Sequence, residues 1–121
     1  MKHQRQGRKF GRVKNQRKAL LSALLGSLIL HEKIKTTEAK AKEIKGMMDK
    51  LINKAKKTGN VEAKVAIIRD LKNNLPAVAV KKLTGEFLGK FSSRNSGYTR
   101  VIKLAPRKTD SAKMAIIEFV D

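Results

Sequence analysis

The chain has 121 residues, and its 29 lysines and arginines against 10 aspartates and glutamates give a formal net charge of +19 at pH 7. This length suits one domain with a modest core, and so large a charge repels itself unless a polyanion neutralises it. The absence of cysteine excludes disulfides and thiolate metal sites, and an aromatic content of 4% without tryptophan argues against a platform that stacks single-stranded bases. Nucleic acid is therefore the first candidate partner, and an anionic membrane surface is the second.

The first segment, residues 1–18, contains no acidic residue and has too few apolar residues to bury itself. We interpret residues 1–14 as a basic arm that orders on an anion, and residues 15–121 as a single domain. Arginines make forked contacts to phosphate, which favours nucleic acid over a merely solvated tail. The candidate RNA-binding cations of this segment are Lys2, Arg5, Arg8, Lys9, Arg12, Lys14, Arg17 and Lys18.

The next stretch, Asn15 to Leu30, predicts the central helix of the domain. It is apolar on nearly every side after its first turn, so we expect the rest of the chain to cover most of its faces. Its apolar run is shorter than the ~20 residues that a membrane crossing needs. No secretory signal or other targeting segment is visible, which predicts a cytoplasmic protein.

A short strand is expected at His31–Thr37, followed by a second helix for which Thr37 is the N-terminal cap. Ala41, Ile44, Met48, Leu51 and Ala55, joined by Met47 and Ile52, recur at helical spacing and predict one buried stripe. Gly59 suits the end of this helix.

Two further helices are expected. Asn60 caps the third, with a stripe of Val61, Val65, Ile68 and Leu71. Pro76 suits the first position of the fourth, in which Val80, Leu83 and Phe87 face inward. Leu88–Gly97 is rich in glycine, serine and asparagine and is expected to be a loop.

The last part of the chain predicts a β-hairpin. Tyr98–Leu104 alternates, Pro106–Ser111 is a basic turn, and Lys113–Val120 has an apolar face of Ala115, Ile117 and Phe119. The strand at His31–Thr37 is expected to join it, because an isolated hairpin is marginally stable. The predicted fold class is α+β: one two-layer domain of helix, strand, three helices and β-hairpin, preceded by the basic arm.

No set of residues predicts catalysis. The sequence offers no pair of carboxylates in an apolar setting and no serine or tyrosine beside a base with an orienting acid. His31-Glu32 lacks the second histidine of a zinc-protease motif, because Lys35 stands at that position. We therefore expect no enzyme activity, no metal, no cofactor and no small-molecule substrate.

The cations lie on the arm, on helix faces and in two late segments, which suits a protein that phosphate surrounds on several sides. A DNA-reading protein would more often concentrate them on one recognition helix. Tyr98 is open to two interpretations: it stacks on a splayed base, or it packs on its cross-strand neighbours. The late candidate RNA-binding residues are Arg94, Tyr98, Arg100, Lys103, Arg107 and Lys108.

The ordered motifs of this chain resemble those of the bacterial large-subunit ribosomal protein seventeen family. Asn53–Leu88 matches poorly, and Lys2, Gln16 and Ser96 depart mildly from the family's pattern. The matching residues are Met1-Lys2-His3, Gly7-Arg8-Lys9, Gly11-Arg12, Arg17 to Leu21, Ser27-Leu28-Ile29, His31 to Thr37, Ala39 to Glu43, Arg94, Gly97 to Arg100, Lys103, Arg107, Asp110 and Met114 to Glu118.

The resemblance implies an α+β structural component of the large ribosomal subunit, near the nascent-chain exit side. It implies binding to the largest rRNA and contact with neighbouring ribosomal proteins. By motif position it implies RNA contacts from the arm, with His3 among its residues, from Arg94, from the Gly97–Arg100 edge and from Arg107.

Two alternatives stay open at the level of the sequence. A nucleoid-type DNA-binding protein would carry similar charge, and it would prefer duplex DNA to folded rRNA. A membrane-surface protein would need an exposed amphipathic helix, whereas the stretch to Leu30 is apolar nearly all round and fits a core better.

Overall fold

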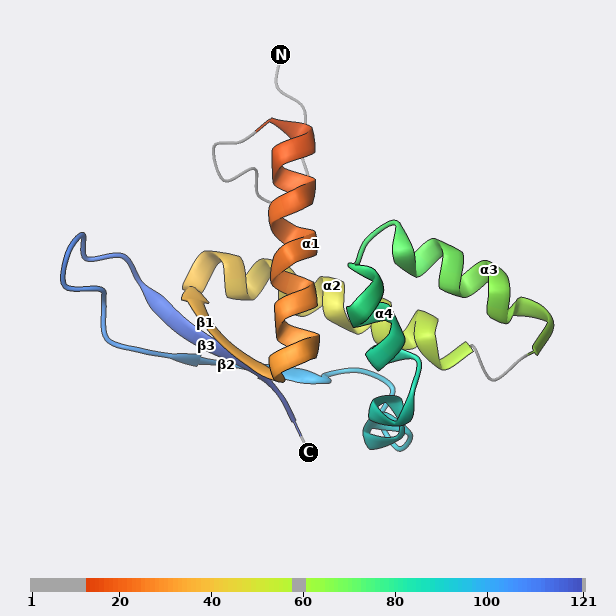
Figure 1. Ribbon diagram of the computed structural model, residues 1–121. Helices are drawn as coiled ribbons and strands as arrows, with labels where there is room; N and C mark the ends of the chain where they lie inside the picture. Colours follow the sequence, from red (N-terminus) through yellow and green to blue (C-terminus); the bar gives the residue numbers. More distant parts are fainter. Residues whose placement is uncertain (1–12, 58–60, 121) are drawn as a thin grey trace, which may run out of the picture.

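The computed structural model describes residues 13–57 and 61–120. Its elements in chain order are α1 (Lys14–His31), β1 (Lys33–Thr37), α2 (Glu38–Lys56), α3 (Val61–Lys72), α4 (Ala77–Leu83), the 3₁₀ helix η2 (Glu86–Phe91), β2 (Thr99–Lys103) and β3 (Met114–Phe119). Helices and sheet form two layers, with α2 packed against one face of the sheet (Figure 1). The predicted α+β class and element order are therefore confirmed.

The three strands form one antiparallel sheet in the order β1-β3-β2. The predicted hairpin partners pair with Val101 opposite Ile117, and β1 joins on the other side with Ile34 opposite Ile117. Ala115, Ile117 and Phe119 are buried, as the alternation of the last strand predicts. The strand that follows α1 thus joins the hairpin as expected.

Helix α2 begins and packs as predicted. The Thr37 hydroxyl accepts a hydrogen bond from the Lys40 N–H at 3.4 Å. The whole predicted stripe is buried except Met47, which is half-buried against it. The predicted helix boundary at Gly59 and cap at Asn60 lie outside the described residues.

Helix α1 is buried along only part of its surface. Leu21, Leu25, Leu28 and Ile29 are in the core, whereas Leu30 is 40% exposed. The expectation that the rest of the chain covers most faces of this helix is therefore wrong for its amino-terminal turns, which project beyond the other elements (Figure 1). The physical reason is that the elements in contact with α1, mainly α4, β1 and α2, leave Ala19, Ala23 and Leu30 exposed along it.

Other expected boundaries and faces need correction. His31 ends α1 rather than starting a strand, because Glu32 adopts a left-handed conformation (φ 65°) that stops the helix. Pro76 is the N-cap of α4 rather than its first residue, and Val65 is 66% exposed instead of buried. The expected loop at Leu88–Gly97 begins inside η2, which continues to Phe91.

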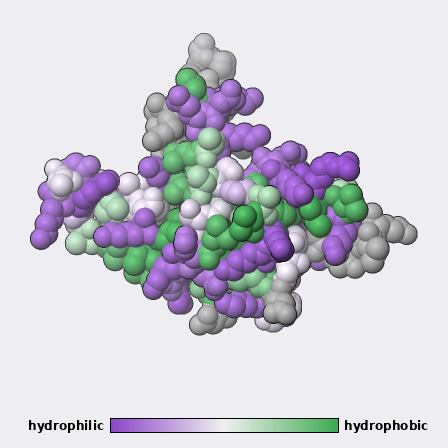
Figure 2. Space-filling model, viewed as in Figure 1, coloured by the Kyte–Doolittle hydropathy of each residue, from purple (hydrophilic) through white to green (hydrophobic). Residues whose placement is uncertain are grey.

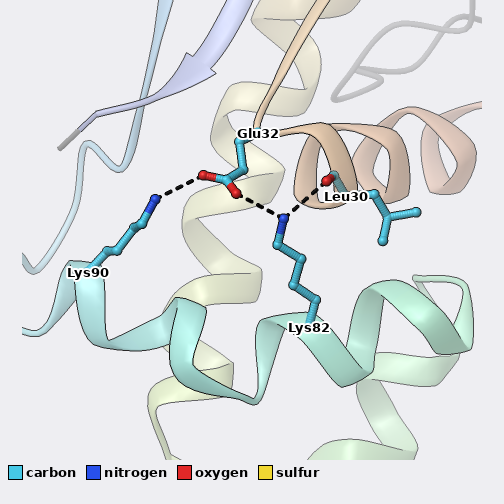
Figure 3. Close-up of polar contacts among 4 residues, drawn as sticks. All are labelled: Leu30, Glu32, Lys82 and Lys90. Carbon is cyan, nitrogen blue, oxygen red and sulfur yellow. Dashed lines mark hydrogen bonds and ion pairs between the residues drawn. The ribbon is translucent and has the colours of Figure 1, made fainter.

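Glu32 also ties the end of α1 to α4 and η2 (Figure 3). Its carboxylate accepts hydrogen bonds from Lys90 Nζ at 2.9 Å and from Lys82 Nζ at 3.0 Å. Lys82 Nζ also donates to the Leu30 carbonyl at 3.1 Å, which satisfies one of the last acceptors of α1. The hydrogen bonds from Lys90 and Lys82 lower the pKa of Glu32 below its ordinary value.

Candidate nucleic-acid interface

All the acidic side chains that the structure describes form ion pairs or hydrogen bonds within the protein. Most are ion-paired, and Asp49 instead accepts the backbone N–H groups of Gly97 and Tyr98 at 3.4 and 3.2 Å. These engaged carboxylates belong to Glu32, Glu38, Glu43, Asp49, Asp70, Asp110 and Glu118. Because each of these carboxylates is engaged within the protein, the more numerous lysines and arginines present a surplus of positive charge to any partner.

Glu38 is one of these engaged carboxylates, and it forms ion pairs with two lysines. It begins α2, where a negative charge is favourable beside the helix N-terminus. Lys42 Nζ lies 2.8 Å from its carboxylate and Lys103 Nζ lies 3.8 Å away. The hydrogen bond from Lys42 is the main cause that lowers the pKa of Glu38. The carboxylate therefore stays charged and links α2 to the end of β2.

Three of the predicted cations stand on the first turns of α1. Lys14 and Lys18 are exposed, and Arg17 is half-buried with one guanidinium nitrogen 3.5 Å from Glu43. This end of the helix has no acidic residue in its first turn and no side-chain cap. The positive end of the helix dipole adds to these charges, so the local potential favours an anion.

A second group of predicted cations lies around the hairpin. Arg100 pairs with its cross-strand neighbour Glu118 at 2.7 Å and is 56% exposed. Lys103 is 72% exposed, and Arg107 pairs with Asp110 inside the turn. Lys108 is exposed at the tip of the same turn. The hairpin therefore displays cations from the sheet edge to its connecting loop.

Arg94 lies before β2. Its guanidinium donates to the Gly97 carbonyl at 3.5 Å, and its own carbonyl accepts from Lys56 Nζ. These contacts fix the bend that leads into the strand. The side chain is half-buried, so part of it faces solvent.

Tyr98 corrects the prediction of a base-stacking residue. Its side chain is fully buried, and its ring packs edge-to-face on Phe91. The hydroxyl donates to the Asn53 side chain and accepts from Lys56 Nζ at 2.9 Å. The ring is therefore not exposed for a base to stack on. It packs on Phe91 of η2 and lies beneath Lys56 Nζ of α2, 4.7 Å from its centroid, rather than on the expected cross-strand neighbours.

The remaining predicted contacts of the arm, which are Lys2, His3, Arg5, Arg8, Lys9 and Arg12, lie outside the described residues. Within the described residues, sequence reasoning overlooked Lys33 and Lys35, which alternate on β1 and are exposed on the sheet face opposite α2. Their spacing of two along a strand was the available signal. Hydrophilic side chains cover much of the surface in Figure 2, with apolar patches between them.

Neither a metal site nor a membrane span is found where the structure describes the chain. Over residues 13–57 and 61–120, no three histidine, cysteine or acidic side chains gather in a way that could hold a metal ion. Among these same residues, no helix combines the length and apolar character that crossing a membrane requires.

Comparison with known proteins identifies the family. The family model described as "Ribosomal protein L17" matches residues 20–120. The large ribosomal subunit protein bL17 of Chlorobium phaeovibrioides is 50% identical over 121 residues, which are all of this chain and 66% of that protein. The bL17 proteins of Chlorobium chlorochromatii and Thermodesulfovibrio yellowstonii are 50% and 49% identical, and the alignments include all of this chain and 76% and 88% of those proteins. The resemblance seen in the motifs is thus confirmed: the chain belongs to the ribosomal protein L17 family.

Proposed function

We propose that this chain is a non-enzymatic structural component of the large ribosomal subunit that binds and stabilises large-subunit rRNA. The family match carries the ribosomal assignment, and it favours this function over that of a nucleoid-type DNA-binding protein. The rRNA contacts come from the basic arm, from the first turns of α1 and from the cations of the hairpin. Neighbouring ribosomal proteins are the other partners.

The observation that supports RNA binding is the contrast between carboxylates engaged inside the protein and lysines exposed on its surface. Described carboxylates are consumed in internal contacts, whereas lysines such as Lys33, Lys35 and Lys108 are exposed and have no described carboxylate within ion-pair distance. A net charge of +19 on 121 residues therefore has its compensation outside the protein. Folded rRNA supplies phosphate on several sides at once.

The first experiment measures binding to large-subunit rRNA over a range of salt concentrations. The logarithm of the binding constant is expected to fall linearly with the logarithm of salt, by about 0.7–0.9 for each neutralised phosphate. Deletion of residues 1–14 is expected to weaken binding and reduce the slope, while circular dichroism shows that the domain stays folded.

Two results would contradict the proposal. Undiminished binding after the deletion would remove the arm from the interface. A preference for duplex DNA over rRNA in competition at matched salt would favour the nucleoid alternative. Sedimentation completes the test, because the protein is expected to travel with large subunits through moderate salt washing.

A further inference from the structure

A groove runs between α1 and α2 and reaches the turn before α4. It consists of two hollows of about 270 and 240 Å³ that share Leu25, Met47 and Asn74 in their walls. We call it the α1–α2 groove. Leu21 and Leu51 extend its apolar floor at the two ends. The floor is therefore continuous from the first turns of α1 to the middle of α2.

Cations surround this apolar floor at both ends. Lys14, Lys18 and Arg17, which also pairs with Glu43, line the end formed by α1, and Lys50 and Lys54 line the end formed by α2. No acidic residue lines either hollow, although Lys54 reaches out to pair with Asp70. Lys50 is exposed beside the opening. The charge at the rim thus suits a ligand that is anionic on both sides of an apolar centre.

Polar groups complete the wall. Ser22 and Asn74 line the hollow together with Lys14 and Lys18. A hydroxyl and a carboxamide each offer donors and acceptors, which suit the polar edge of a planar base. An apolar floor with a few polar groups is the usual composition of a small-ligand site, and hollows of this size admit a single base-sized group.

We propose that the α1–α2 groove holds one unpaired nucleotide of large-subunit rRNA, with its base on the Leu25–Met47 floor and its flanking phosphates on the cations at the two ends. This inference rests on the proposed function and names a specific site for it. RNA is favoured over a protein segment because the rim is cationic at both ends. Unpaired bases in loops and bulges are the parts of RNA that can be splayed into such a site.

The test fills the groove without changing its charge. Ser22→Met places a longer side chain in the wall, and Ala23→Met is the matched control because Ala23 is exposed on the same helix and does not line the groove. The probe is protein-free large-subunit rRNA, mapped by reagents that modify unpaired bases and by hydroxyl radicals that cleave the backbone. Thermal unfolding checks that both variants fold.

The expected result is that the wild-type chain and Ala23→Met protect the same unpaired base, whereas Ser22→Met leaves that base reactive. The affinity of Ser22→Met is expected to fall about fivefold or more, because the base can no longer bury its face on the apolar floor. Identical base protection and affinity in the two variants would overturn the groove as a nucleotide site. A Ser22→Met protein that binds rRNA normally but fails to join large subunits would also overturn it, because a protein partner would then occupy the groove.

A second pair of variants tests the charged rim and does not depend on the first. Lys50→Ala removes a rim cation, whereas Lys45→Ala removes an exposed lysine of α2 outside the groove. Lys50→Ala is expected to reduce the salt slope by about 0.7, and Lys45→Ala is expected to leave it unchanged. Equal slopes for the two variants would overturn the phosphate contact at this end. Failure of the proposed function itself looks different, because the wild-type chain would then protect neither bases nor backbone, whereas backbone protection without any base protection would overturn only the groove.

Discussion

The two ends of α1 differ in what surrounds them. At the carboxyl end, Leu28 and Ile29 are fully buried, Gly26 lies against Pro76, and Lys82 satisfies the Leu30 carbonyl. At the amino end, the first turn has no acidic side chain and no side-chain cap, and most of its residues are exposed. The carboxyl end is therefore stabilised by burial and by a hydrogen bond. The amino end carries positive charge beside the positive pole of the helix dipole, which is unfavourable unless an anion binds there.

The largest expected effect comes from a cavity at the buried end. Leu28→Ala is expected to lower the free energy of unfolding by about 2–5 kcal/mol, because Leu28 is fully buried and its neighbours cannot collapse completely into the space. Leu20→Ala, on the half-buried amino-terminal side, is expected to cost about 1 kcal/mol or less. Urea denaturation measures both. Equal losses would show that the two ends contribute alike.

The next effect tests close packing at Gly26. A Cβ there would lie 2.9 Å from the Cδ and Cγ atoms of Pro76, so Gly26→Ala is expected to destabilise the fold by about 1–3 kcal/mol. Gly46→Ala is the matched control, because a Cβ at Gly46 in α2 meets no atom within 4 Å. The control is expected to stabilise the fold by about 0.5–1 kcal/mol. Thermal unfolding would contradict this contrast if both changes had the same sign.

A smaller effect concerns the residue that ends α1. Glu32→Ala loses the contacts to Lys82 and Lys90 and keeps a left-handed conformation that suits neither alanine nor glutamate. Glu32→Gly loses the same contacts but relieves the backbone. The glycine variant is therefore expected to be more stable than the alanine variant by about 1 kcal/mol. A more stable alanine variant in urea denaturation would contradict this account of the helix end.

The pH dependence of the same variants isolates the carboxylate. Because the folded-state pKa of Glu32 is lowered, its ion pairs contribute stability above the unfolded pKa of about 4.3, and this contribution disappears as pH falls through the lowered value. The stability of the wild-type chain relative to Glu32→Gly is therefore expected to decrease between pH 6 and pH 3. The change should stay below about 1 kcal/mol, because the side chain is 43% exposed.

Sequence patterns predicted the parts of this fold that depend on interactions between residues close in the sequence. The stripe of α2, the cap at Thr37 and the inward face of β3 follow from spacing and from one hydroxyl, and the structure confirms them. The predictions were wrong where the burial of a residue depends on segments that are distant from it in the sequence. The cover on α1 depends on where α4 packs, and the burial of Tyr98 depends on an aromatic cluster assembled from η2 and β3.

The candidate site likewise has a part that the sequence predicts, its cations, and a part that it does not, the α1–α2 groove. Composition and motif position predicted which cations are available, and the structure leaves Lys14, Lys18, Lys103 and Lys108 exposed. The α1–α2 groove was beyond sequence reasoning, because Met47 and Asn74 come together only when two helices and a later turn are packed. Periodicity marks Met47 as a core residue and gives no sign that its side chain also forms the floor of a groove.

The position of Tyr98 has a practical consequence. It is the single tyrosine of a chain without tryptophan, so the tyrosine emission originates from one fluorophore at the junction of α2 and β2. Its hydroxyl is held by Asn53 and Lys56, and both contacts are lost when this junction opens. Emission therefore reports opening at one known place without an attached dye.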